Sequence, residues 1–384
     1  MRGIAAGAIY SGPDMVFLLL LPLRLFQAQA LAAPSEWVRA LPPAAVQVFP
    51  DRHEIAIELA PIDLPAGMMH DEMAGMAMPQ ASMSERHAHN PVYPPVMGVD
   101  LPFSGWMSGF RIELTDAAGR TVPSQLLHHY NLIDPTHREL FLPISRRVLA
   151  AGGETGAVHT TRWLLGAPFV KGDRLVANAM LHNPTMQSYS GVRTRLILTY
   201  TAVGRWYPLV RAYPWQFDVA FPVGDKSFDL PPGQSEKFYE GSPAVPGKIV
   251  GISGHVHDHA VALELRDLTA GRVIWRATPI TDSTGHVVGM PQKKFIGWRG
   301  VGVRIRPDHR YRVTVFYNNP TGGTLPEGGM GVAAGLFRLA SDAKWPTADA
   351  GDSLYVRDLR HALRFDAAPA LSARLGTGVE HAHH

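Results

Sequence analysis

The stretch His53-Glu54-Ile55-Ala56-Ile57-Glu58-Leu59 decides the fold class of this chain. Apolar and polar side chains alternate along it, which is the pattern of a β-strand with one buried face. Similar short runs recur along the chain, between clusters of turn residues, and very few stretches (145–151 is one) have a helical pattern. The sequence therefore predicts an all-β fold. We expect further strands at 109–114, 139–143, 174–181, 192–203, 248–252, 260–265, 272–278, 298–305, 311–317 and 331–339.

Length and composition fit two domains. The chain has 384 residues, of which 46% are hydrophobic and 18% charged, so it can bury a sizeable core. Its 37 glycines and 32 prolines favour frequent turns between short strands. Prolines and glycines also interrupt the middle of the chain, near residues 213–226. We expect two consecutive antiparallel β-sandwiches of a jelly-roll type, at 45–215 and 216–345, and a C-terminal tail at 346–384.

Residues 1–32 have the pattern of a signal peptide. Arg2 precedes a short apolar run at 15–23, and small-x-small cleavage motifs follow at 28–30 and 30–32. This run is too short and too interrupted for a good membrane span, which argues against a membrane anchor. We therefore expect a periplasmic or secreted protein.

Two features of the composition limit what the protein can bind. The net charge is only +3 and no basic run stands out, so the sequence gives no support for binding nucleic acid. There are no cysteines, which excludes disulfides and leaves His, Met, carboxylate and backbone groups as possible metal ligands.

The His255-Val256-His257 motif is the strongest candidate for part of a metal site. Residues two apart on a strand share a face, so both imidazoles can reach one ion. His259 continues that face as a third candidate, with Asp258 opposite. The alternative is a polar strand edge whose histidines bind no metal. Such pairs also arise by chance in a chain with 18 histidines.

The adjacent pair His128-His129 poses a geometric condition. Neighbours on a regular strand point to opposite faces, so both can bind one ion only at a β-bulge or at a strand end. Asn131 and Asp134 follow closely, which is compatible with a strand end. Otherwise one histidine would lie in the core and the other on the surface.

His182 and Met330 are weak candidates when taken alone. A single histidine before Asn-Pro is most often a turn residue, and a methionine is usually core filler. Gly328, Gly329 and Gly331 would leave the approach to Met330 open.

The segment from Met68 to Met97 holds seven of the chain's 14 methionines. It lacks the periodicity of a strand or a helix, so we expect a loop. It could capture copper or could be a low-complexity linker. The candidate ligands for copper capture are His70, Met73, Met76, Met78, His87 and His89.

The order of these motifs resembles the copper type II ascorbate-dependent monooxygenases, which include peptidylglycine α-hydroxylating monooxygenase and dopamine β-monooxygenase. The resemblance covers residues 100–340 and is closest to a bacterial branch. It rests on the motifs 126–129, 180–184, 254–259, 317–322 and 328–331.

The resemblance implies two sandwich domains with one copper ion each. His128, His129 and His182 would hold an electron-transfer copper. His255, His257 and Met330 would hold the catalytic copper, where dioxygen hydroxylates a C–H bond of a small molecule or peptide. Ascorbate or another reductant would supply the electrons. The chain departs from the animal enzymes in lacking cysteine and in carrying the Met-rich segment.

Two other functions remain open. One is a non-catalytic periplasmic copper-binding or copper-resistance protein on the same fold, supported by the Met-rich segment. The other is a β-sandwich recognition module, such as a carbohydrate binder, with a face built from Trp106, Trp206, Trp215 and Trp298. These tryptophans fit core positions better.

Overall fold

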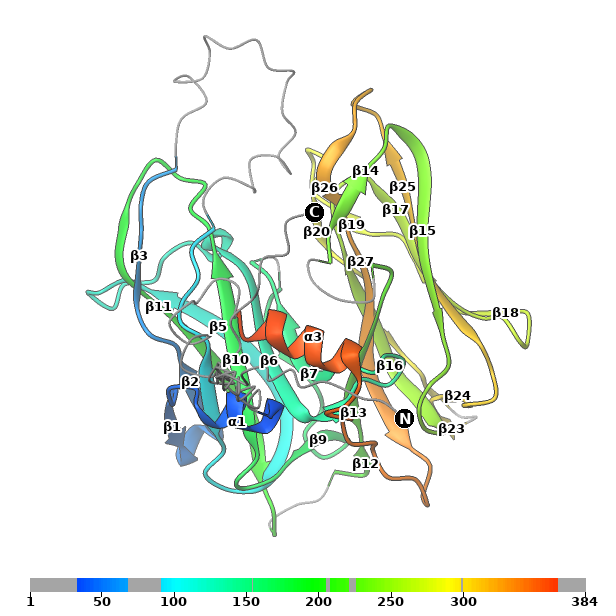
Figure 1. Ribbon diagram of the computed structural model, residues 1–384, viewed down its shortest axis with the longest axis horizontal. Helices are drawn as coiled ribbons and strands as arrows, with labels where there is room; N and C mark the ends of the chain where they lie inside the picture. The colour runs from blue at the N-terminus through cyan, green and yellow to red at the C-terminus, as the bar shows by residue number, and fades with distance from the viewer. Residues whose placement is uncertain are drawn as a thin grey trace, which may run out of the picture.

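The structure is a computed structural model that describes residues 33–67, 91–153, 155–204, 208–220, 226–297 and 300–364. Strands dominate this part of the chain, and almost all of them pair antiparallel (Figure 1). The predicted all-β fold class is therefore confirmed. One parallel pair, between β9 (Leu165–Phe169) and β12 (Val210–Arg211), departs from the antiparallel pattern.

Two sheets enclose the first core, and we call this unit the first sandwich (left in Figure 1). Alternating residues of both sheets, among them Ile55, Ile57, Tyr130 and Leu196, meet in its interior. The larger sheet has the order β1-β2-β11-β5-β9-β12, with β3 on β11 and β8 on β5, and the smaller has the order β4-β10-β6-β7. Besides β9 and β12, the strands of the first sandwich are β1 (Ala45–Phe49), β2 (Glu54–Glu58), β3 (Ile62–Leu64), β4 (Met97–Asp100), β5 (Gly105–Thr115), β6 (Leu127–Arg138), β7 (Ser145–Ala151), β8 (Val158–His159), β10 (Arg174–Leu181) and β11 (Tyr189–Ala202).

Two other sheets enclose a second core and form the second sandwich (right in Figure 1). One has the order β13-β27-β16-β21, with β24 also on β16, and the other has the order β15-β25-β17-β18. The strands are β13 (Tyr213–Asp218), β15 (Gly233–Gly241), β16 (Gly247–Val256), β17 (Ala260–Asp267), β18 (Arg272–Ala277), β21 (Lys293–Lys294), β24 (Val303–Ile305), β25 (Tyr311–Asn319) and β27 (Gly331–Leu339). Small pairs accompany them: β14 (Phe228–Leu230) with β26 (Leu325–Gly329), β19 (Ile280–Thr281) with β20 (Val287–Gly289), and β22 (Ile296–Gly297) with β23 (Gly300–Val301).

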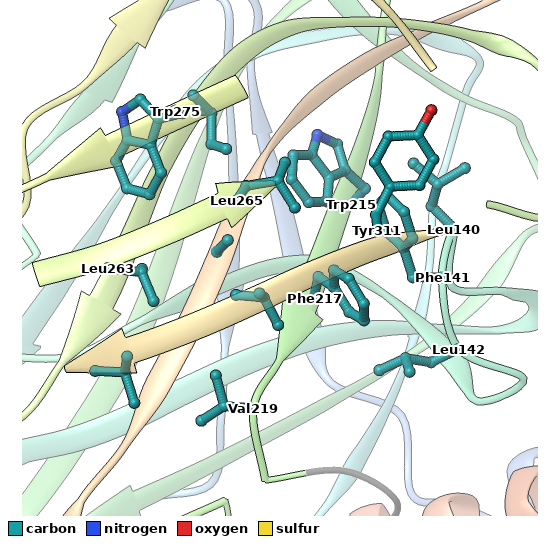
Figure 2. Packing of buried hydrophobic residues seen from close by; sticks show 14 of the residues in the cluster. Leu140, Phe141, Leu142, Trp215, Phe217, Val219, Leu263, Leu265, Trp275 and Tyr311 are labelled. Carbon is teal, nitrogen blue, oxygen red and sulfur yellow. The ribbon is translucent and has the colours of Figure 1, made fainter. Parts of the chain in front are cut away.

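The connection between β6 and β7 ties the two sandwiches together. Leu140, Phe141 and Leu142 belong to the second core, where Phe141 stacks on Phe217 at 4.3 Å between ring centroids (Figure 2). Beside them, the fully buried Glu139 accepts backbone N–H groups of Arg147 (2.6 Å) and Gln216 (3.1 Å). Packing and hydrogen bonds therefore join the first half of the chain to the second.

Two helices cover the outer face of the β4-β10-β6-β7 sheet. Figure 1 shows both helices, α1 (Pro34–Arg39) and α3 (Ser353–Ala362), beside this sheet. Their buried residues pack together with Ile133 of β6 and Val176 of β10. Asp358 of α3 binds the Arg147 guanidinium through two hydrogen bonds of 2.6 and 2.7 Å, and both side chains are largely buried. This ion pair holds part of the predicted C-terminal tail on the first sandwich.

Two local predictions were wrong. Residues 145–151 form β7, because pairing with β6 overrides their helical pattern. Residues 139–143 are apolar because they fill the second core, and they form no strand. The predicted strand at 298–305 is broken into β23 and β24, with residues 298–299 outside the described part.

The division into two domains stays a prediction, and β13 (Tyr213–Asp218) runs across the expected boundary at residue 215. The expected signal peptide at 1–32 lies outside the described residues. Among the residues that are described, no helix is long and apolar enough to span a membrane.

Candidate metal centre

Strand register brings together the residues of the His-x-His and Met motifs. β16 pairs antiparallel with β27, with His255 opposite Val332 and Val256 opposite Gly331. The next pair in this register is His257 opposite Met330, one step beyond the end of the ladder. Directly opposite residues share a face, and His255 lies two residues from His257 on that face. Val256 points the other way, into the second core.

The distance between the two imidazoles is compatible with a shared ion. The ring centroids of His255 and His257 lie 5.5 Å apart, with the ring planes at 88°. With metal–nitrogen bonds of about 2 Å and a ring radius of about 1.2 Å, two rings on one ion have centroids at most about 6.4 Å apart. The pair meets this limit, and Met330 adds a thioether to the same face.

Tyr317 of β25, the first residue of the 317–322 motif, links the ends of these two strands, a role that the sequence did not indicate. Its hydroxyl accepts the backbone N–H of Met330 (2.8 Å) and of His257 (3.3 Å), and it donates to the Met330 carbonyl oxygen (2.5 Å). The side chain is only 2% exposed, and burial raises the pKa of its hydroxyl, which keeps the donated proton in place. The hydroxyl thus fixes the backbone of both residues from the opposite sheet of the second sandwich.

The glycines around Met330 serve close packing, which corrects the expectation of an open approach. A Cβ added at Gly329 would lie 2.3 Å from the Phe228 ring, and one at Gly331 would lie 2.7 Å from the Val315 side chain. These positions are buried, whereas Met330 is half-buried. The glycines therefore let the chain pass close to the second core.

His259 does not continue the strand face, which corrects a second expectation. β16 ends at Val256, and His259 has a left-handed backbone with a φ of 68° in the turn before β17. Its carbonyl oxygen accepts the Asn318 N–H at 2.9 Å. The neighbouring Asp258 accepts a hydrogen bond from His286 Nδ1 at 2.8 Å, a pairing that the sequence did not indicate.

The expected condition for the His128-His129 pair is met, because a β-bulge lies at this point. Met180 pairs with His129 and Leu181 pairs with Leu127, which leaves His128 as the extra residue. The ring centroids of His128 and His129 lie 5.4 Å apart. A bulge re-aims side chains that would otherwise point to opposite faces.

His182 follows the end of β10 and lies beside this bulge. Its backbone N–H donates to the Leu126 carbonyl at 3.0 Å, and its side chain is 4% exposed. The ring centroids of His182 and His128 are 6.2 Å apart, with the planes nearly perpendicular. This separation also lies within the limit for two rings on one ion.

Met180 is a further sulfur donor at this end of the first sandwich. It lies directly opposite His129 in the register, and it precedes by two residues His182, which follows the end of β10. Both relations place its side chain on the same face as these histidines. The sequence signal for this donor was the Met-x-His spacing at the end of the predicted strand 174–181.

In each histidine set, rings lie close together in pairs, but no three His, Asp or Glu side chains surround a common point. Over the described ranges between 33 and 364, no three His, Asp or Glu side chains form a group that could hold a metal ion. That finding concerns nitrogen and oxygen donors, and both sets also contain a methionine. The residues therefore fit copper in donor type and in pairwise separation. In the first set, a bound ion would have to draw the three histidines closer together.

The face that carries the second set looks toward the first sandwich. Met330 immediately precedes β27, and alternation along the strand places it on the same face as Leu336. Leu336 packs on a small core that contains Val250 together with Leu165 and Val210 of the first half. Several candidates fall outside the described residues: His70, Met73, Met76, Met78, His87 and His89.

Two of the four tryptophans cannot contribute to an exposed binding face. Trp106 and Trp215 are buried, at 7% and 1% exposure, whereas Trp206 and Trp298 lie outside the described residues. This corrects the arrangement on which a carbohydrate-binding module would depend.

Comparison with known proteins adds little. No family model and no curated protein matches the sequence. Among solved structures, PNGF-II is 9% identical with a TM-score of 0.33, and the match covers 74% of this chain and 66% of that one. A fucolectin from striped bass (Morone saxatilis) serum is 10% identical with a TM-score of 0.20, covering 76% of this chain and 97% of that one. Similarities at this level carry no argument about function.

Proposed function

We propose that this protein is an exported dicopper monooxygenase, acting in the periplasm or outside the cell. The observation that carries the proposal is the register of β16 and β27, which pairs Val256 with Gly331. Continued by one step, it brings His257 opposite Met330, and the Tyr317 hydroxyl is hydrogen-bonded to the backbone N–H of both residues. Two imidazoles and a thioether suit copper, because the thioether favours the reduced ion. Bound there, copper would supply the oxidation chemistry by which dioxygen and a reductant such as ascorbate hydroxylate a C–H bond.

The residues of this chain divide the work. His255 and His257 supply nitrogen donors from one strand, Met330 supplies a weak sulfur donor, and Tyr317 holds the backbone of His257 and Met330 in register. In the first sandwich, His128, His129 and His182 would hold the electron-transfer ion. Met180, which pairs with His129, would be a fourth donor there. The substrate would be a small molecule or a peptide.

Copper stoichiometry and turnover test the proposal together. The purified protein should bind two copper ions, and a substrate should stimulate its oxidation of ascorbate. His257→Ala and Met330→Leu should abolish this stimulation and leave the first ion bound. His259→Ala is the matched control, since His259 does not continue the ligand face, and it should behave as wild type. A fully loaded protein that holds a single ion refutes the dicopper assignment.

A copper-binding or copper-resistance protein without catalysis is the second candidate. One observation favours it: the described residues that flank 68–90, which hold most of the Met-rich segment, lie close to His182. Gly67 N–H donates to the Thr185 carbonyl at 2.7 Å, and Val92 exchanges two backbone hydrogen bonds with Leu181. Deleting residues 68–89 should then cost most of the copper affinity or the copper tolerance of the host. Unchanged affinity and tolerance after the deletion would count against this candidate.

A further inference from the structure

Three cationic side chains form a row across neighbouring strands of the second sandwich. Lys248 of β16 lies directly opposite Arg304 of β24 on one side and Arg338 of β27 on the other. Directly opposite residues share a face, so the three side chains stand next to one another. We call Arg304, Lys248 and Arg338 the cation row.

The cation row is electrostatically unfavourable in the protein alone. Like charges directly opposite each other on adjacent strands destabilise a sheet. Within the described ranges, no carboxylate forms an ion pair with any of the three side chains. A bound anion would remove this repulsion.

The cation row lines a pocket of about 570 Å³, which is the size of a small-molecule site. Arg306 and Asp308 also line it and neutralise each other through an ion pair of 2.8 Å, which leaves Asp342 as the other acidic side chain of the lining. The pocket therefore has a net positive charge. Lys248 is seven residues from His255, about 23 Å along the strand, so the pocket is separate from the candidate copper ligands.

We propose that the cation row binds a small polyanion with at least two phosphate or carboxylate groups. Adjacent strands lie about 4.8 Å apart, so the row spans about 10 Å, which is wider than one such group. Arginine matches phosphate and carboxylate oxygens with paired hydrogen bonds, and lysine adds a compact charge between the two arginines. The proposal does not depend on the copper chemistry.

Inorganic pyrophosphate is the probe, and orthophosphate is its single-group counterpart. The ionic strength is held constant with sodium chloride, because exposed charges are screened by salt. The wild-type protein should gain a saturable increase in Tm with pyrophosphate and a smaller one with orthophosphate. Calorimetric titration should give an affinity about tenfold lower, or weaker still, for K248Q/R338Q than for wild type.

The variant K293Q/K294Q is the matched control. It removes the same charge from exposed positions of β21 in the same sheet, so it should keep the pyrophosphate response. Without anion, K248Q/R338Q should unfold at the same or a higher temperature than wild type, because the repulsion is relieved. The proposal is overturned if wild type does not respond, if K248Q/R338Q still responds, or if the control loses the response equally. A lower Tm of anion-free K248Q/R338Q than of wild type would show that the cation row does not destabilise the protein, and this would also overturn the proposal.

Discussion

Replacing Tyr317 by phenylalanine tests whether the hydroxyl of this residue sets the geometry of the second ligand set. The substitution keeps the buried ring and removes one oxygen atom, which takes part in three hydrogen bonds with the backbone of Met330 and His257. Each bond contributes roughly 1 kcal/mol, so we expect a loss of about 2–3 kcal/mol in the free energy of unfolding. The loss is at the lower end of this range if water replaces the hydroxyl as the partner of the half-buried His257 N–H.

The more specific effect of the substitution is expected at Met330 itself. Without the hydroxyl, the Met330 amide loses a 2.8 Å hydrogen bond, and its hydrogen exchange should become about tenfold faster. In copper-loaded protein, X-ray absorption should show a weaker copper–sulfur contribution, because the Met330 backbone is no longer held opposite His257. A purely structural role would lower the stability and leave the sulfur signal intact.

Tyr311→Phe is the matched control for this experiment. Tyr311 lies on the same strand and is fully buried, and its hydroxyl accepts one hydrogen bond, from the Arg306 N–H at 3.0 Å. The control should lose about 1 kcal/mol and should speed exchange near Arg306 only. If both variants leave the Met330 amide and the sulfur signal unchanged, the positioning role of Tyr317 is refuted.

Three further predictions concern other sites. In Met330→Leu, the second site loses its sulfur donor, so the copper–sulfur contribution that remains should come from Met180 at the first site. It should vanish in the double variant with Met180→Leu, and X-ray absorption of both copper-loaded variants decides this. Asp358→Ala leaves the Arg147 guanidinium buried without its partner and should cost about 3–5 kcal/mol in denaturant unfolding, whereas retained stability would mean that the ion pair contributes little. Burial raises the pKa of Glu139 to about 7, so the folded state keeps a proton that the unfolded chain releases near pH 4.5. Stability should therefore fall, by at most ~3 kcal/mol, as the pH rises from about 4.5 to 7, and Glu139→Gln should flatten this dependence in pH-resolved unfolding curves.

The sequence predicted most of the strands because their pattern is local. Residues 174–181 and 331–339 match β10 and β27 in full, since alternation reports a face that is buried by a neighbouring sheet. The same reasoning failed at 139–143, where an apolar run reports burial and says nothing about strand pairing. It failed again at 145–151, because a short segment can pair as a strand whatever its intrinsic preference.

The candidate site was predictable to a different degree. The residue types and their order could be read from the sequence, and so could the condition that His128-His129 needs a bulge. The bulge itself depends on how β6 aligns with β10, and that alignment arises from the packing of the whole sheet. The role of Tyr317 could not be predicted, because this residue lies 60 residues from His257 and has the pattern of an ordinary core position of an alternating strand.

The two ligand sets are held by different parts of the fold, and this has a chemical consequence. The register of His257 and Met330 is fixed by Tyr317, which reaches across the second core, and by Phe228, which fills the space above Gly329. His128 instead belongs to a bulge, and His182 follows the last residue of β10, so the first set lies where the sheet pairing ends. An electron-transfer ion needs donors that move little between its two oxidation states, and the buried His182, whose N–H donates to the Leu126 carbonyl, meets that need. A catalytic ion needs a fixed open position, and the Tyr317 hydroxyl holds the backbone of His257 and Met330 beside it. The proposed division of roles therefore rests on two different anchors.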